Sequence, residues 1–331
     1  MSAVCIRRPE TPDFMNVLIT DYDFPDVALE LDLFRAAGID VTTAQCKTED
    51  QLIEAGRDAD AFLLQYAPAT RRVFEALPRL KIVSRYGAGF DTINTDDARA
   101  CGVWVGNSPD YGVHEVASHA LAMALNLTRH LSFYDRDIRD GKWHYLTPGV
   151  LKRPSNMTVG ILGLGRIGKR FAHIARETFG KVTACDPYLM AYDFPPYVNR
   201  VDLDTLFASA DIVSLHTPLN DETRNIVNAR VLGLMKPGSY VVNTARGGLV
   251  NVDDALQALD SGRLGGLALD VLPTEPPGDH PLVRHPRTIL TPHAAFFSRE
   301  AEKELRSKAA QNIITFARTG RPDYVVIEGA R

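Results

Sequence analysis

The sequence contains no run of about 18 apolar residues, the length that a membrane-spanning helix requires, so we predict no transmembrane segment. It also lacks an excess of one charge, because 37 basic and 41 acidic residues leave a net charge of −4. That balance gives no electrostatic footprint for nucleic acid or for an anionic membrane. We therefore expect neither as a partner.

Paired cysteines are missing as well. The four cysteines, Cys5, Cys46, Cys101 and Cys185, are scattered and form no C-x-x-C pair, so we predict neither a disulfide framework nor a zinc site. The start of the chain has no apolar core of a secretory signal peptide, and we expect residues 1–14 to form a loose tail. A reducing compartment, the cytoplasm, fits these features.

Glycine, in contrast, recurs near the middle of the chain at a spacing typical of dinucleotide binding. Gly163, Gly165 and Gly168 follow an apolar run over 158–162 and open a predicted helix, in the order G-x-G-x-x-G. The first glycine permits the turn, the second lets backbone approach a pyrophosphate, and the third lets helix pack on strand. Asp186 ends the next apolar run, 18 positions after Gly168, as expected of the acid that binds the ribose hydroxyls of NAD.

Two alternative interpretations of the glycine turn and one competing motif elsewhere in the chain are less favourable. A P-loop would also fit Gly163 to Lys169, but Arg170 stands where Ser or Thr must hold magnesium. A plain strand-turn-helix would not explain the position of Asp186. His114 and His119 resemble a zinc helix, but they are five positions apart and do not share one face well, so we predict no metal site.

Apolar and polar segments alternate in a way that predicts parallel α/β sheets in two domains. The first section has predicted strands at 17–20, 41–44, 61–64, 81–84 and 103–105, with helices at 29–37, 49–55 and 71–76. Helices at 113–129 and about 132–139 and a loop at 147–156 come next. The second section has six predicted strands, at 158–162, 182–185, 211–215, 240–243, 266–269 and 288–290, with helices at 204–208, 229–234 and 253–259. A final helix at 299–318 is expected to return to the first domain.

Three ionisable residues follow strands of the second section, where ligands of an open α/β sheet bind. Arg246 follows 240–243, Glu275 comes shortly after Asp270, and His293 follows 288–290. A guanidinium can bind a carboxylate bidentately, and a histidine beside a carboxylate can pass a proton near neutral pH. Each residue alone would be a surface charge or a structural histidine. Together, in a chain with a dinucleotide turn, they predict NADH-dependent reduction of a 2-oxo acid.

Several motifs in order resemble the D-isomer-specific 2-hydroxyacid dehydrogenase family, from Asn16 onward. They are RYGAGFD at 85–91, GILGLGRIG at 160–168, LHTPL at 215–219, VNTARGGLV at 242–250 and TPHAA at 291–295. DPYL at 186–189, the double glycine after Arg246 and HAAFFS at 293–298 make the sequence most similar to the C-terminal-binding protein branch. The resemblance implies two doubly wound parallel-sheet α/β domains. A Rossmann NAD domain (109–298) is inserted in a discontinuous flavodoxin-like substrate domain (1–108 and 299–331).

The resemblance also implies roles. Arg246 would bind the substrate carboxylate, His293 would be the general acid or base, and Glu275 would pair with His293. The implied NAD-binding residues are Gly163, Gly165, Arg166, Ile167, Asp186, Thr217, Pro218, Thr244, Ala245, Arg246, Asp270 and His293. The implied substrate-binding residues are Tyr86, Gly87, Ala88, Arg246, His293 and Phe296, with the backbone N–H groups of Gly87 and Ala88 holding the carboxylate. The family usually dimerises through the cofactor domain, with the 113–139 helices as candidates.

Departures from the family pattern refine the expected substrate and cofactor. Phe296 replaces a tryptophan usual in the C-terminal-binding proteins, and the loop 65–68 has no basic residue where phosphate-binding relatives carry arginine. We therefore expect a small non-phosphorylated acid. No arginine follows Asp186 to accept a 2′-phosphate, so we predict NAD over NADP. The alternative function is an NAD(H)-sensing binding protein. The presence of Arg246, Glu275 and His293 favours the enzyme, although the corepressors also keep these residues. The short N-terminal tail and C-terminus, which leave little length for docking a partner, favour the enzyme as well.

Overall fold

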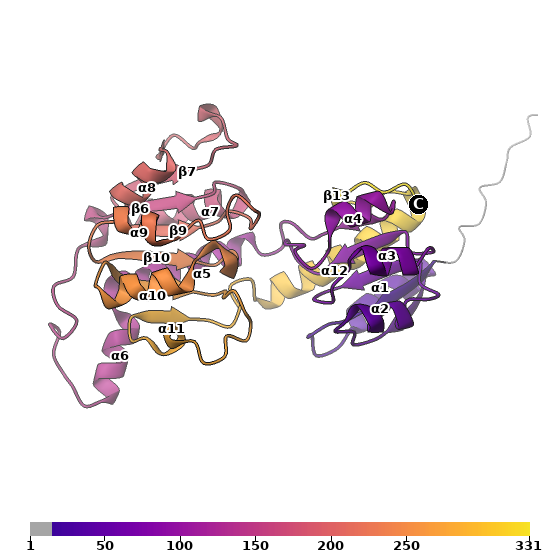
Figure 1. The fold of residues 1–331 in the computed structure, drawn as a ribbon, viewed down its shortest axis with the longest axis horizontal. Coiled ribbons are helices and arrows are strands. Elements are labelled where there is room, and N and C mark those ends of the chain that lie inside the picture. Colours follow the sequence, from indigo (N-terminus) through magenta and orange to yellow (C-terminus); the bar gives the residue numbers. More distant parts are fainter. Residues whose placement is uncertain (1–14) are drawn as a thin grey trace, which may run out of the picture. The chain divides into compact units, whose positions relative to one another are not determined.

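The computed structural model describes residues 15–331 and divides into two compact units, shown in Figure 1. One unit takes in the described residues up to Tyr111 together with Arg299–Arg331, and the other is the insert Gly112–Ser298. The predicted tail at 1–14 lies outside the described residues. The chain therefore enters the insert from the first unit and returns to that unit through its last helix.

The first unit, which we call the outer unit, is a six-stranded sheet with helices on its faces. Its strands have the order β13-β5-β4-β3-β1-β2, and all of the pairs are parallel except β13 with β5. Its elements are β1 (Asn16–Ile19), α1 (Ala28–Ala37), β2 (Asp40–Thr43), α2 (Glu49–Ala55), β3 (Ala61–Leu64), α3 (Arg71–Ala76), β4 (Ile82–Arg85), α4 (Thr95–Ala100), β5 (Trp104–Gly106), α12 (Arg299–Thr319) and β13 (Val325–Ile327).

Local sequence signals explain where these helices begin and end. The Thr48 side chain accepts a hydrogen bond from the Gln51 N–H and begins α2, and the Asn94 side chain does the same for Asp97 at the start of α4. Gly38 ends α1 in the left-handed region, with φ 72°. All four residues of β3 are buried, as expected for a central strand of a parallel sheet covered on both faces.

A buried polar network ties the returning helix α12 to the rest of the outer unit. Glu30 of α1 is fully buried and receives two hydrogen bonds from Arg306 of α12, Nε to Oε1 at 2.8 Å and Nη2 to Oε2 at 2.7 Å. The Tyr86 hydroxyl donates to the same carboxylate at 3.0 Å. The Arg306 guanidinium also lies over the Phe24 ring, 4.9 Å from its centroid. The charge of Glu30 is thus compensated by a cation and by a second donor.

The insert, which we call the inner unit, is a seven-stranded parallel sheet with the order β12-β11-β10-β9-β6-β7-β8. Its elements are α5 (Val113–Arg129), α6 (Leu131–Arg139), η1 (Pro154–Asn156), β6 (Thr158–Leu162), α7 (Arg166–Ala175), β7 (Lys181–Cys185), η2 (Ala191–Asp193), β8 (Val198–Arg200), α8 (Leu203–Ser209), β9 (Ile212–Leu215), α9 (Ala229–Leu234), β10 (Ser239–Asn243), η3 (Gly247–Leu249), α10 (Val252–Asp260), β11 (Leu264–Leu269), α11 (Pro281–Arg284) and β12 (Thr288–Leu290).

The strand order reverses beside β6, between its neighbours β7 and β9. Two cores cover the faces of this sheet, one containing residues of α5 and α7 and the other residues of α8, α9 and α10. Such a reversal point leaves a crevice beyond the carboxyl ends of the strands, and ligands of doubly wound sheets bind there. The glycine turn after β6 opens at this crevice.

The structure confirms the two α/β sheets and corrects parts of the predicted element list. The inner sheet has seven strands rather than six, because the three-residue edge strand β8 buries only Val198 and gives almost no apolar signal. Strand β13 adds an antiparallel edge to a sheet predicted to be parallel. The short helices α4 and α11 were not predicted, and the predicted loop at 147–156 ends in the 3₁₀ turn η1. No helix within residues 15–331 has the length and apolarity to cross a bilayer.

Candidate functional site

The glycine turn after β6 has the geometry that a pyrophosphate requires. Gly163 adopts φ 89°, in the left-handed region, and a Cβ there would lie 2.7 Å from the Thr217 backbone nitrogen. A Cβ on Gly168 would collide with the carbonyl oxygen of Gly163, so only glycine lets α7 pack this closely. A Cβ on Gly165 would meet nothing within 4 Å, which leaves open space beside the first turn of α7. The turn therefore fits a dinucleotide, and its helix start presents free N–H groups to the phosphates.

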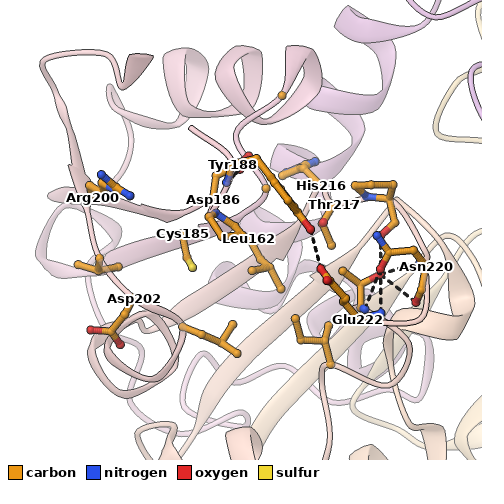
Figure 2. Close-up of a pocket in the computed structure, with 18 of the residues that line it drawn as sticks. Leu162, Cys185, Asp186, Tyr188, Arg200, Asp202, His216, Thr217, Asn220 and Glu222 are labelled. Carbon is orange, nitrogen blue, oxygen red and sulfur yellow. Dashed lines mark hydrogen bonds between the residues drawn. The ribbon is translucent and has the colours of Figure 1, made fainter. Parts of the chain in front are cut away.

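Asp186 is fixed at the end of β7 by two backbone donors. The N–H of Leu164 donates to Oδ2 at 2.8 Å, and the N–H of Tyr188 donates to Oδ1 at 3.1 Å. The carboxylate is thus connected to the glycine turn itself. It lines a cavity of about 1000 Å³ that begins at the turn, and Figure 2 shows it beside Leu162, Cys185 and Tyr188.

His216 lines the same cavity at the end of β9, directly against the glycine turn. Its backbone N–H donates to the Leu162 carbonyl at 2.7 Å, and its Nε2 lies 2.9 Å from the Ser214 hydroxyl. Its ring centroid lies 5.0 Å from that of Phe171. Burial lowers the pKa of His216 to about 3. The imidazole is therefore neutral and adds no positive charge to the wall. The motif LHTPL contains this histidine, but the sequence alone gave it no role.

The three predicted catalytic residues follow three adjacent strands, β10, β11 and β12. His293 Nδ1 lies 2.8 Å from Glu275 Oε2, and the second Glu275 oxygen accepts the N–H of Leu272 at 2.9 Å. Arg246 follows β10, and its Nη1 donates to the Ala245 carbonyl at 2.7 Å. Gly247 lies against the backbone of Leu272, where a Cβ would collide, so the loops bearing Arg246 and Glu275 are in contact.

The ionisation of Glu275 follows from these contacts. Burial raises the pKa of Glu275, but the hydrogen bonds with His293 and with the Leu272 N–H, together with the nearby Arg246 guanidinium, more than offset burial and hold that pKa below its usual value. Glu275 is therefore a carboxylate at neutral pH. It can orient the imidazole and leave Nε2 as the ring nitrogen for proton transfer.

Asp270 proves to be a structural centre of the histidine turn. Its side chain is 2% exposed, and its oxygens accept the Thr291 hydroxyl at 2.5 Å and the N–H groups of Ala294 and Ala295 at 2.8 and 3.0 Å. Its carbonyl accepts the N–H of His293 at 2.8 Å. We expected Asp270 to line the NAD site. Because the Asp270 side chain is buried and its oxygens are already hydrogen-bonded, we infer that it holds the 291–295 turn in place.

The other predicted NAD-binding residues lie around the same strand ends. Thr217 and Pro218 line the cavity after β9, and Arg166 and Ile167 form the first turn of α7. Thr244 and Ala245 follow β10, and Oγ1 of Thr244 is buried with no hydrogen-bond partner in the described part of the chain. Phe296 meets the His293 ring edge-on, with centroids 6.4 Å apart. Over residues 15–331, no three His, Cys, Asp or Glu side chains are grouped to hold a metal ion.

The outer unit has its own polar site at the end of β4. No described acceptor pairs with the N–H groups of Gly87 and Ala88, while the Gly87 and Ala88 carbonyls accept Ser108 N–H and Asn107 Nδ2. A Cβ on Gly87 would collide with the Arg85 guanidinium, so this cation lies directly against the Gly87 backbone. We call the pair of N–H groups with Arg85 the anion cradle. Arg85 is the first residue of the RYGAGFD motif, but the motif alone predicts no role for its side chain.

Tyr86 requires a correction. It was predicted to bind substrate, but its side chain is 2% exposed and its hydroxyl donates to buried Glu30. Burial, followed by the Glu30 charge, raises the pKa of Tyr86, so the hydroxyl stays protonated. The Tyr86 ring, which directly follows the buried strand β4, packs in the core of the outer unit. Tyr86 can support the anion cradle but does not present its side chain to a ligand.

The chain is similar to several known proteins in sequence and in fold. The family model for the D-isomer specific 2-hydroxyacid dehydrogenase NAD binding domain matches residues 121–295. The chain is 34% identical to a glyoxylate reductase of Thermofilum pendens, over 84% of this chain and 84% of that protein. It is 33% identical to a D-3-phosphoglycerate dehydrogenase of Synechocystis sp., over 90% of this chain but 53% of that protein, and thus spans about half of its length. A glyoxylate reductase structure from Paecilomyes thermophila, 27% identical, superposes with a TM-score of 0.86 over 96% of this chain and 99% of that one.

The depressed pKa of His216 predicts a pH-dependent stability. Below about pH 6.5 the unfolded chain binds a proton that the folded chain does not, so stability falls as pH drops toward 3. Between pH 7.5 and 5, urea unfolding should show a loss on the order of 2 kcal/mol from this residue. His216→Gln, which does not titrate, should lack that loss. His173→Gln, at an exposed position in the inner unit, is the control, and equal pH slopes for all three proteins would contradict the assignment.

Proposed function

Because the chain belongs to the D-isomer-specific 2-hydroxyacid dehydrogenase family, we propose that it is an NAD-dependent oxidoreductase acting on a small acid. It transfers hydride between NADH and a non-phosphorylated 2-oxo acid to give the D-2-hydroxy acid, and catalyses the reverse reaction. The observation that carries this proposal is the His293 Nδ1–Glu275 Oε2 pair at 2.8 Å, with Arg246 on the adjacent strand end.

In this proposal NAD binds along the inner unit and supplies or accepts the hydride. Gly163, Gly165 and the first turn of α7 hold the pyrophosphate, and Asp186 holds the ribose hydroxyls. Arg246 binds the substrate carboxylate bidentately and polarises the 2-oxo group. His293 Nε2 gives a proton to the developing alkoxide in reduction and takes it back in oxidation. Glu275 stabilises the protonated ring through Nδ1.

We assign the substrate contacts to a substrate domain, 1–108 with 299–331, which takes in most of the outer unit, and cofactor binding to an NAD domain, 109–298, which takes in the inner unit. The two N–H groups and the Arg85 guanidinium of the anion cradle suit a carboxylate, and Tyr86 anchors the strand end below them. Two carboxylates lie at the end of the neighbouring strand, β3. Asp21 accepts the N–H groups of Gln65 and Tyr66, and Asp23 pairs with both of their side chains. That charge disfavours a phosphate on the substrate.

A phosphorylated 2-oxo acid is the second candidate substrate. Arg85 favours it, because a guanidinium binds phosphate as readily as carboxylate, and phosphoglycerate dehydrogenases are among the relatives. Asp21 and Asp23 argue against it. An NAD(H)-sensing binding protein is the third candidate, and it would keep the cofactor cavity without needing a proton donor.

We predict NADH oxidation with one or more of glyoxylate, pyruvate, hydroxypyruvate and branched or aromatic 2-oxo acids. Removing the proton donor in His293→Ala should lower kcat by roughly 10²- to 10⁴-fold, while the Kd for NADH, measured by fluorescence, stays near that of the wild type. His173→Ala is the control histidine variant. Turnover of 3-phosphohydroxypyruvate alone would overturn the non-phosphorylated class, and tight NADH binding without any turnover would favour the sensor.

Asp186 should set a preference for NADH over NADPH. Its carboxylate is held by the N–H groups of Leu164 and Tyr188, so it cannot turn away from a 2′-phosphate without losing both bonds. We expect NADPH to bind at least about tenfold more weakly, because opposing like charges cost several kcal/mol and a tenfold change in Kd needs only about 1.4 kcal/mol. Asp186→Ser should narrow the gap. Asp193→Ser, which removes another acid bonded to a backbone N–H in the same connection, should not, and comparable binding of both cofactors by the wild type would refute the role.

We propose that the protein forms a homodimer through the inner unit. Helix α6 and the loop after it extend from the body of that unit in Figure 1. This segment carries several exposed large apolar side chains, including Trp143 at 85% and Val150 at 94% exposure. A monomer rarely exposes such a group of residues without a partner. Helix α6 continues from α5 at a single junction residue, His130. The family resemblance favours a second copy of the chain as the partner that covers this segment.

Light scattering after gel filtration should therefore give a dimer. Trp143→Asp places a charge in the apolar surface and should shift the protein toward monomer, raising the dissociation constant by about tenfold or more. Tyr192→Asp changes an aromatic side chain of similar exposure elsewhere on the inner unit and should stay dimeric. A wild-type monomer at micromolar concentration would rule out this interface.

A further inference from the structure

The cofactor cavity of the inner unit is crossed by one side-chain hydrogen bond. The Tyr188 hydroxyl donates to Oε2 of Glu222 at 2.5 Å, from the connection after β7 to the connection after β9. Figure 2 shows Tyr188 reaching from the side of Asp186 toward Glu222 across the middle of the view. We call this pair the strap. Both side chains belong to one unit, so the strap is part of the cavity and not of a contact between units.

Each end of the strap has a fixed backbone. The N–H of Tyr188 donates to Asp186 at 3.1 Å, and Oδ1 of Asn220 accepts the N–H groups of Glu222 and Thr223, both at 3.0 Å. The side chains themselves are exposed, Tyr188 by 75%. Rotation of two side chains therefore opens the strap without a change in either loop. The hydrogen bond to Glu222 raises the pKa of Tyr188, so the phenol remains a donor.

The lining of the cavity is not uniform. The glycine turn and Asp186 lie at one part of it, while Val201, Leu203 and Ile226 add apolar side chains to the lining. A dinucleotide with its pyrophosphate on the turn and its ribose on Asp186 continues into the base. The apolar side chains suit the faces of a purine ring. Its polar edge then needs a partner, and Glu222, with an acceptor-only carboxylate, is an acid that the mechanism leaves unused.

We propose that Glu222 recognises the exocyclic amine of adenine, exchanging the Tyr188 hydroxyl for that amine when NAD binds. The inference rests on the cofactor orientation proposed above. The exchange replaces one donor to the carboxylate by another, so Glu222 is never left without a hydrogen bond. A base with a carbonyl at C6 sets an acceptor against Glu222 at this position and would also lose the strap. Its own donor, N1–H, lies at the neighbouring ring atom, so the base would have to shift to reach the carboxylate.

The test compares NADH with reduced nicotinamide hypoxanthine dinucleotide, whose base has a carbonyl at C6 and a hydrogen on N1 where adenine has an amine and an unprotonated nitrogen. Fluorescence titration of the full chain should give a Kd for NADH about threefold to tenfold lower, the effect of one hydrogen bond to a charged acceptor in a partly exposed site. Glu222→Gln can donate to a carbonyl as well as accept from an amine, so its ratio of the two Kd values should approach one. Glu177→Gln changes an exposed acid that does not line the cavity and should keep the wild-type ratio.

Tyr188→Phe separates recognition from the strap. It removes the competing hydroxyl but keeps the ring, so NADH should bind as well as or better than in the wild type, with the preference over the hypoxanthine dinucleotide retained. A wild-type ratio of one, or a Glu222→Gln ratio equal to that of the wild type, overturns the proposal while leaving the dehydrogenase function intact. Failure of the wild type to bind either dinucleotide overturns both.

Discussion

The buried carboxylate of Asp270 is the constraint on which the candidate active site depends. Removing a carboxylate from water is costly unless its oxygens are paired. Here Thr291, Ala294 and Ala295 supply three donors, and the Asp270 carbonyl binds the N–H of His293. These bonds wrap the chain tightly around the acid. They hold His293 in the left-handed region at φ 54°, which a non-glycine residue adopts only when its surroundings impose it.

The same carboxylate explains how residues far apart in sequence meet. Strands β10, β11 and β12 are neighbours in one parallel sheet, so their carboxyl ends lie on one edge. Arg246, Glu275 and His293 follow these three strands in turn. Asp270 fixes the last of the three loops, and the contact of Gly247 with Leu272 fixes the first against the second. His293 and Glu275 thus come within hydrogen-bonding distance through backbone packing.

The sequence was sufficient for features in which local chemistry and periodicity agree. The glycine turn, the cap at Thr48 and the strand ends bearing Arg246 and His293 were all predictable, because each depends on residues close in the chain. The edge strands β8 and β13 were not, since they pair along one side only and carry little apolar pattern. The burial of Tyr86 and Asp270 could not be predicted either. Both residues are satisfied by partners distant in sequence or by a turn whose geometry no local pattern specifies.

The network of Glu30, Arg306 and Tyr86 extends this argument to the outer unit. Apolar burial alone is non-directional and would let α12 slide or rotate on the sheet. A planar guanidinium that binds one buried carboxylate through two nitrogens accepts a single register. Because α12 rejoins the outer unit only after the whole insert, that register is not set by a short connection. The ion pair sets it instead, and through the Tyr86 hydroxyl it also holds the residue that immediately precedes the Gly87 and Ala88 N–H groups. A buried ion pair can thus determine the position of backbone donors that are not themselves part of the pair.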